Sequence, residues 1–422
     1  MSFYSDSNVK TKYLDPRVYI PNSRATFDLD MTEIAYLPNM KLGFVGVTST
    51  VSHSYNGLVG AGAIIRNIRL LDGKTVLSQL VETQFYKGFL NQNMSNAHSQ
   101  AVDSNLEGNR IGQTIQGSNR EVTRVAAIKS ANPTADTTDS GYIDLKQYLS
   151  ILTQLTHLPT AIFNNLRIEI EFNAKPSNQV LSATQGLTIE TIRPILMVDV
   201  LENPTIVDNL NKNMSAVAWS EIEHDQFVIA AAPAGSAAAS DGLVQPLNVK
   251  LNGYNNKIVD RMLIVKEIAD STLVLNAGGV VQGYGKWGSQ ACLGQKVQFR
   301  VNGRNILPRQ GLVGNNERLA FVVDTWGECA NFPGSNIYQA DTAPVMSSAP
   351  QYAGTLDYIA VYLGVQINDL QLNYSRIGVQ QTAGAGDQLA TTAALIGHVY
   401  CEVRKQLIMV GGGQYRVEYI QE

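Results

Sequence analysis

Strict alternation of apolar and charged residues is the feature that most constrains the fold of this chain. The segment Leu166–Phe172 reads LRIEIEF, with an apolar residue at every even position and a charged residue at every odd one. Successive side chains of a β-strand point to opposite faces, so this pattern predicts a strand with one face in a core and the other facing outward. The same alternation recurs at Phe27–Met31, Leu247–Leu251, Val297–Val301, Tyr358–Val365 and Gln414–Ile420.

Three dipeptides that favour tight turns lie beside such runs. Asp72-Gly73 separates Ile64–Leu71 from Lys74–Val81, whereas Asn252-Gly253 and Asn302-Gly303 each follow an alternating run. Asn, Asp and Gly readily adopt the positive φ angles that two-residue turns require. Each dipeptide is therefore predicted to form a turn with positive φ after a strand.

Helical signals are few. Asp144 is a candidate N-cap for a helix that ends before Pro159, because leucines recur behind it at helical spacing. Those leucines are Leu145, Leu149, Leu152 and Leu155. Two further short helices are expected at Glu82–Gln92 and Asn203–Asn213. Many short strands and few helices indicate an all-β protein built from two sandwiches or barrels.

The chain length and a restart of the strand pattern indicate two domains. At 422 residues the chain is too long for one ordinary core. Leu187–Val200 reads as a long strand, and the alternation begins again after about residue 213. We expect an N-terminal arm over residues 1–19, a first domain over 20–200, a linker helix over 201–213 and a second domain over 214–422.

Charge and cysteine usage narrow the functional classes. Charged residues make up 16% of the chain, below the roughly 25% of soluble domains, which favours a surface covered by neighbouring molecules. The net charge is −4 and no run of Lys or Arg occurs, so we expect no direct sequence-specific nucleic-acid binding. Met1–Lys12 has no apolar core, so secretion is not expected. The scattered Cys292, Cys329 and Cys401 indicate synthesis in an intracellular, reducing environment.

No residue pattern points to catalysis, a cofactor or a metal ion. Gly283–Gly288 has spaced glycines, but a strand pattern follows it instead of a long helix, so it reads as a surface loop. Glu221, Glu223, His224 and Asp225 cluster, and we expect them on the solvent side of a strand. The histidines are far apart in sequence, at His53, His98, His157, His224 and His398. We therefore predict no catalytic, cofactor-binding or metal-binding residues and no enzymatic activity.

Segments in both halves follow one another in an order and spacing found in one known protein family. The first half has a hairpin followed by a helix at Ile64–Gln92 and a proline-leucine block that leads into a strand at Gly141–Phe172. An exit strand with a helix follows at Ile195–Asn213. The matching segments of the second half are Val297–Arg304, Tyr358–Val365, Leu372–Ile377 and Val399–Val410.

This order, over nearly the whole chain, resembles the double jelly-roll major capsid proteins of icosahedral DNA viruses. The family spans adenoviruses, membrane-containing phages, virophages, polinton-like viruses and nucleocytoplasmic large DNA viruses. The resemblance implies two tandem eight-stranded jelly rolls with a few short helices, and a homotrimer whose six rolls form a pseudo-hexagonal capsomer. It implies a structural protein of the virion shell, with further copies of itself, penton proteins and minor or cement capsid proteins as partners. Whether a lipid membrane lies beneath the shell stays open.

Two other classes of β-rich protein remain as alternatives. A trimeric viral spike or receptor-binding protein would favour a slender stalk or sequence repeats, and none is visible. A carbohydrate-active β-sandwich enzyme would need paired carboxylates in an aromatic cleft, and the sequence places no such pair.

Overall fold

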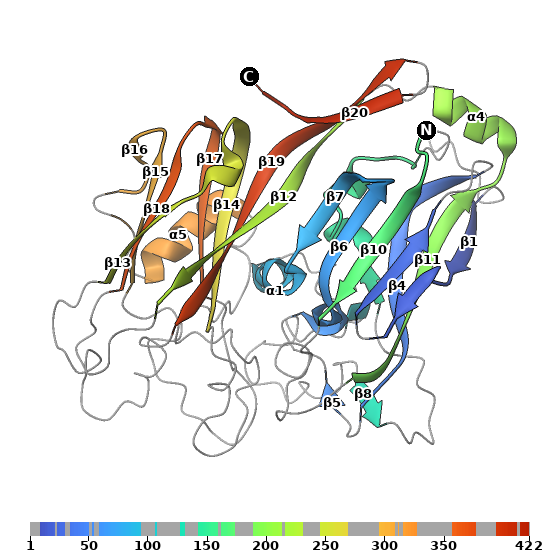
Figure 1. Ribbon diagram of the computed structural model, residues 1–422, viewed down its shortest axis with the longest axis horizontal. Helices are drawn as coiled ribbons and strands as arrows, with labels where there is room; N and C mark the ends of the chain where they lie inside the picture. The colour runs from blue at the N-terminus through green and yellow to red at the C-terminus, as the bar shows by residue number, and fades with distance from the viewer. Residues whose placement is uncertain are drawn as a thin grey trace.

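The computed structural model consists of two β-rich halves that lie side by side, as Figure 1 shows. The structure describes residues 9–21, 23–29, 34–49, 53–54, 59–93, 106–107, 127–130, 142–158, 162–173, 189–212, 216–230, 245–268, 295–308, 311, 315–326, 357–376, 394–411 and 414–421.

The first half forms two sheets around one core. The strands of one sheet are β1 (Val9–Leu14), β4 (Ala35–Ser49), β5 (His53–Ser54), β8 (Ala127–Ser130), β9 (Tyr142–Asp144) and β11 (Ile189–Leu201). Their order is β1-β11-β4-β8-β5, and β9 also pairs with β4. The strands of the other sheet are β2 (Val18–Ile20), β3 (Arg24–Asp28), β6 (Ile65–Asp72), β7 (Thr75–Val81) and β10 (Leu166–Phe172). Their order is β2-β3-β10-β6-β7.

The second half repeats this plan. The strands of one sheet are β12 (Ala216–Ile229), β14 (Lys257–Ile268), β17 (Asp357–Ile367), β19 (Leu395–Gly411) and β20 (Gln414–Tyr419). Their order is β12-β19-β14-β17, and β20 also pairs with β19. The strands of the other sheet are β13 (Gln245–Lys250), β15 (Gln295–Val301), β16 (Arg304–Asn305) and β18 (Leu370–Arg376). Their order is β13-β18-β15-β16.

Eight strands correspond one to one between the halves. In chain order they are β1, β3, β4, β6, β7, β9, β10 and β11 in the first half, and β12 to β19 in the second. In each half the first strand pairs with the eighth, the eighth with the third and the third with the sixth. The second, seventh, fourth and fifth strands form the other sheet. This is the strand order of a jelly roll, so the prediction of two eight-stranded jelly rolls is confirmed.

The alternating pattern places side chains as the sequence predicts. In β10, Leu166, Ile168, Ile170 and Phe172 are buried, while the charged residues between them are half-buried on the outer face. Strand β10 lies between β3 and β6, so its apolar face contributes to the centre of the first core.

Two of the three predicted turns are confirmed and one is wrong. Gly73 has a φ of 57° between β6 and β7, and Asn302 and Gly303 have φ angles of 49° and 82° between β15 and β16. Asn252-Gly253 instead begins a 3₁₀ turn, Asn252–Tyr254 (η7), and the positive φ of 61° falls on Asn256. The N–H of Asn256 donates to the carbonyl of Ile367, which fixes this different connection.

The predicted helices at 82–92 and 203–213 are confirmed as α1 (Thr83–Asn93) and α4 (Pro204–Lys212). Asp144 caps a turn as predicted, because its carboxylate accepts from the N–H of Lys146. The predicted helix behind it is wrong: two 3₁₀ turns, Leu145–Gln147 (η4) and Ser150–Thr153 (η5), bury the same leucines. A further 3₁₀ turn, Gly60–Ile64 (η2), precedes β6. Helix α5 (Asn315–Trp326) was not expected from the sequence.

Candidate functional site at the junction of the two rolls

Helix α1 of the first roll packs its aromatic residues against the second roll. Phe85 stacks on His398 of β19, with ring centroids 4.1 Å apart and 20° between the ring planes. Tyr86 packs against Tyr400 with centroids 5.3 Å apart. Tyr400 belongs to the same buried apolar cluster as the core of the first roll. The two rolls are therefore joined by continuous apolar packing.

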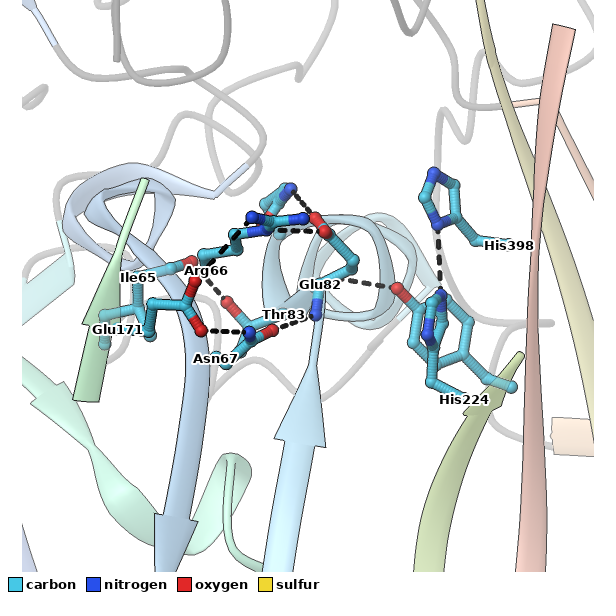
Figure 2. A network of polar contacts seen from close by, with 10 residues as sticks. Ile65, Arg66, Asn67, Glu82, Thr83, Glu171, His224 and His398 are labelled. Atoms are coloured by element: carbon cyan, nitrogen blue, oxygen red, sulfur yellow. Dashed lines mark hydrogen bonds and ion pairs between the residues drawn. The ribbon is translucent and has the colours of Figure 1, made fainter. Parts of the chain in front are cut away.

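Glu82, between β7 and α1, is held in the left-handed conformation by contacts from both rolls (Figure 2). Its φ is 49°, which non-glycine residues rarely adopt. Its N–H donates to Asn67 Oδ1 at 3.0 Å, and its carbonyl accepts from the Tyr400 hydroxyl at 2.6 Å. Its carboxylate accepts from Arg66 Nε at 2.7 Å and from Gln84 Nε2 at 2.8 Å. These contacts offset a backbone strain of about 1–3 kcal/mol and fix the start of α1.

The same network continues across the first roll to β10. Asn67 Nδ2 donates to Glu171 Oε2 at 2.6 Å, and Arg66 Nη1 lies 3.6 Å from Glu171 Oε1. Thr83 Oγ1, in the first turn of α1, donates to the carbonyl of Ile65 at 2.7 Å. Strands β6 and β10 therefore hold the helix that contacts the second roll.

Two histidines that are 174 positions apart in sequence meet at this junction. His224 Nε2 on β12 lies 3.1 Å from His398 Nδ1 on β19, so one ring donates a hydrogen bond to the other (Figure 2). Burial lowers the pKa of His224 to about 3, and His398 and Arg66 add to this shift. Because burial opposes protonation of its ring, His224 is uncharged at neutral pH.

Glu221 on β12 is a buried carboxylate that binds the first roll. Its oxygens accept from Ser78 Oγ at 2.9 Å, from the Gln79 N–H at 2.6 Å and from Trp219 Nε1 at 2.7 Å. Burial raises the pKa of Glu221 to about 7, although these donors and Lys405 favour the charged form. The expected position on the solvent side of a strand is therefore wrong for Glu221, because β7 of the first roll covers that side.

Glu223 forms a half-buried ionic group next to Glu221. Its carboxylate accepts from Lys257 Nζ and from the Tyr419 hydroxyl, both at 2.6 Å, and lies 3.2 Å from Lys405 Nζ. Burial would raise the pKa of Glu223, but these partners outweigh it and lower the pKa below its usual value. Both lysines also lie over the Tyr419 ring, 4.2 and 5.0 Å from its centroid. Strand β20 is held against β12 and β14 by this group.

The C-terminal hairpin reaches back to the first roll. The hydroxyl of Tyr415 on β20 donates to Asp72 Oδ2 at 2.6 Å, and the other oxygen of Asp72 accepts from the N–H of Asn165. The Tyr415 ring meets Phe163 edge-on at 5.1 Å. Asp72 therefore has two roles. It is the last residue of β6, before the turn to β7, and it holds the β19–β20 hairpin through the hydroxyl of Tyr415.

This chain is similar to known proteins in structure but not detectably in sequence. No protein-family model and no curated protein matches the sequence. Solved structures match along the whole chain. VP54 of PBCV-1, in a crystal structure fitted into a reconstruction of the virophage Sputnik, has a TM-score of 0.58 at 9% identity, with 100% of this chain and 99% of that chain covered. The mavirus major capsid protein has a TM-score of 0.56 at 10% identity, with 99% of this chain and 91% of that chain covered.

The cryo-EM structure of the Sputnik virophage also matches, with a TM-score of 0.55 at 9% identity and coverage of 99% and 90%. This chain has the double jelly-roll fold of viral major capsid proteins. At such low identity the double jelly-roll fold is what these chains share, so the roles of individual residues rest on the geometry described above. The resemblance first indicated by the order of sequence segments is confirmed.

In this double jelly roll, two residues of chemically reactive types, Cys401 and His157, are buried in the packing of the rolls. Cys401 is buried, and burial raises the pKa of its thiol. His157 is buried, and burial lowers its pKa. Within the described ranges, no group of three or more His, Cys, Asp or Glu side chains is arranged to hold a metal ion. None of the helices in the described part of the chain is long and apolar enough to cross a bilayer. Gly283–Gly288, His98, Cys292 and Cys329 lie outside the described residues.

Sequence reasoning missed the groups that join the rolls. Glu82, Tyr400 and Glu221 belong to segments separated by more than a hundred residues, and pairing of such segments leaves no local pattern. One signal was present, because Trp219 and Glu221 fall on the same side of β12, and a tryptophan on a supposed solvent face indicates a covered surface.

Proposed function

We propose that the chain is a major capsid protein, whose function is to assemble into the shell of a virion. The observation that carries the proposal is the fold match, which extends over 100% of this chain and 99% of the PBCV-1 protein. Two jelly rolls that share one apolar cluster suit a protein that tiles a surface. We propose further that three chains form a pseudo-hexagonal capsomer, and that such capsomers tile an icosahedral shell with penton and minor or cement proteins.

We propose that the protein acts by assembly and not by catalysis, without a cofactor. The buried carboxylate Glu221, whose pKa is raised, is occupied by three donors at the junction of the rolls and leaves no open face for a substrate. Synthesis inside the host cell, without secretion, goes with this role. The proposed units remain residues 20–200 and 214–422, joined by 201–213. Within the segment 1–19, expected to be an arm, the described residues include β1, and β2 begins at Val18; the two strands belong to the two sheets of the first roll.

The oligomeric state of the purified protein tests this proposal. Light scattering coupled to size exclusion should give about three times the chain mass of 45.9 kDa, and negative-stain images should show particles with a hexagonal outline. A monomer at micromolar concentration would contradict the trimer, and an elongated particle with a stalk would favour a spike protein.

A further inference from the structure

Two Asn-Gly dipeptides of the second roll lie beside the same turn, the one that joins β17 to β18. Asn302-Gly303 connects β15 to β16, and its first residue donates its N–H to the carbonyl of Asp369 at 2.8 Å. Asn252-Gly253 begins the η7 turn between β13 and β14, and the residue before it donates its N–H to the carbonyl of Leu370 at 2.9 Å. Both dipeptides are exposed to solvent. A third, Asn56-Gly57, lies outside the described residues.

An asparagine that precedes glycine can lose ammonia without an enzyme. The backbone nitrogen of the glycine attacks Cγ of the asparagine and loses its proton, the bond from Cγ to Nδ2 breaks, and Nδ2 leaves as ammonia. Water then opens the resulting cyclic imide at one of its two carbonyls, which gives aspartate or isoaspartate. Glycine favours the attack because it has no Cβ to crowd the nitrogen. The side chain must be free to bring Cγ onto that nitrogen.

The side chain of Asn302 is not free to make this movement. Its Nδ2 donates to the carbonyl of Gln366 at 2.9 Å, and its Oδ1 accepts from the N–H groups of Asn368 at 2.7 Å and Asp369 at 3.2 Å. These three hydrogen bonds hold the amide against the turn between β17 and β18. Attack by the nitrogen of Gly303 would require the amide to leave all three partners, and each lost bond adds to the barrier.

The side chain of Asn252 is not held in this way. It makes no hydrogen bond or ion pair with any residue in the described part of the chain. The η7 turn is closed by a long hydrogen bond, from the N–H of Asn255 to the carbonyl of Asn252 at 3.3 Å. A Cβ added at Gly253 would meet only Asp225 Oδ2, at 3.9 Å, so the glycine is not crowded. Asn252 can therefore turn its amide toward the nitrogen of Gly253.

We propose that Asn252 is a site of spontaneous deamidation in the folded protein, with water as the co-reactant, and that the contacts of Asn302 protect the second dipeptide. The product carries a negative charge at position 252, next to the glycine that faces Asp225. In the isoaspartate form the backbone runs through the side-chain carbon and is longer. This change lies two residues before Tyr254, which is buried in the core of the second roll.

Peptide mapping of the purified chain tests the proposal. The folded protein is incubated at mildly alkaline pH, digested at intervals and analysed by mass spectrometry, which detects the replacement of an amide NH2 by OH. The same incubation is run in concentrated urea and is continued until half of the unfolded chain has reacted. In urea both asparagines should react at similar rates, because only the local sequence remains. In the folded protein Asn252 should react, as aspartate and isoaspartate, and Asn302 should keep its amide.

Gly253→Val is the matched control for the chemical route. Gly253 does not have a positive φ and is not crowded, so valine fits there, and circular dichroism should show unchanged strand content. The branched side chain crowds the attacking nitrogen, so the peptide that contains Asn252 should keep its amide in this variant.

Three results would overturn the proposal. The first is an Asn252 that keeps its amide in the folded protein over the time in which it reacts in urea. The second is an Asn302 that reacts as fast as Asn252 in the folded protein, because its hydrogen bonds would then give no protection. The third is an unchanged rate at Asn252 in folded Gly253→Val, because ammonia would then be lost without attack by the backbone nitrogen.

Discussion

At the scale of single residues, the junction between the rolls contains a carboxylate, Glu221, whose charged form is disfavoured by burial. Glu221 is fully buried between β12 and β7, and the pKa of its side chain is raised to about 7. The pKa of a free glutamate is near 4.5. The protonated form therefore favours the folded state below about pH 4.5, and this contribution is lost as the pH rises through 7.

Replacement of Glu221 by glutamine should remove this pH dependence. Between pH 5 and pH 8, the unfolding free energy of the unsubstituted protein should fall relative to that of Glu221→Gln, by up to roughly 3 kcal/mol. Urea unfolding at several pH values measures it. Glu169→Gln, on the outer face of β10, is the matched control and should follow the unsubstituted protein. Parallel pH profiles for Glu221→Gln and the unsubstituted chain would contradict the assignment.

At the scale of elements, local sequence predicts strands and turns well when one face meets water. Strand β10 follows the alternating pattern because its outer face is solvated or only partly covered. The alternating pattern fails to predict a solvent face for β12, since the second roll covers one side of this strand and the first roll covers the other.

The two Asn-Gly dipeptides show the same limit of local sequence. Asn302-Gly303 closes a hairpin between neighbouring strands, whereas Asn252-Gly253 leads into a connection set by a distant partner, Ile367.

The two Asn-Gly dipeptides give a matched pair of substitutions. Gly303 has a φ of 82°, so a β-branched side chain there is strained, and Gly303→Val should lower the unfolding free energy by about 1–3 kcal/mol. Gly253 lies in a 3₁₀ turn without positive φ, and an added Cβ would meet only Asp225 Oδ2, at an ordinary contact distance of 3.9 Å, so Gly253→Val should cost less than about 1 kcal/mol. Thermal melting of both variants measures the difference, and equal melting temperatures would show that the turn at 302–303 is misassigned.

At the scale of the whole molecule, the two rolls form one apolar body, and the sequence alone could not show this. The order of segments predicted two rolls and their strand content. It could not predict that Tyr400 and Ile222 complete the first roll's cluster, because such contacts depend on how the rolls pack and not on any local period. Helix α5 was missed for a related reason, since it is a short helix whose position depends on packing against β17.

Acid should weaken the joint between the rolls. The pKa of His224 is lowered to about 3, so the neutral form stabilises the folded state above about pH 6.5, and this contribution is lost as the pH falls toward 3. Between pH 6.5 and pH 4, the unsubstituted protein should lose up to roughly 3 kcal/mol relative to His224→Gln. Urea unfolding followed by tryptophan fluorescence measures this loss of unfolding free energy, because Trp219 is buried at the joint between the rolls. The prediction fails if both proteins lose stability equally over this range.

The pairing of the first strand with the last in each roll has a consequence for synthesis. Val9 of β1 pairs with Leu201 of β11, so the first roll stays open until almost two hundred further residues have been translated. At about 5–20 residues per second, this delay is roughly 10–40 s. During that time β1 is not yet part of a sheet, because β11 lies between β1 and β4. The β1-β11-β4 sheet of a nascent chain therefore stays incomplete until β11 has been translated.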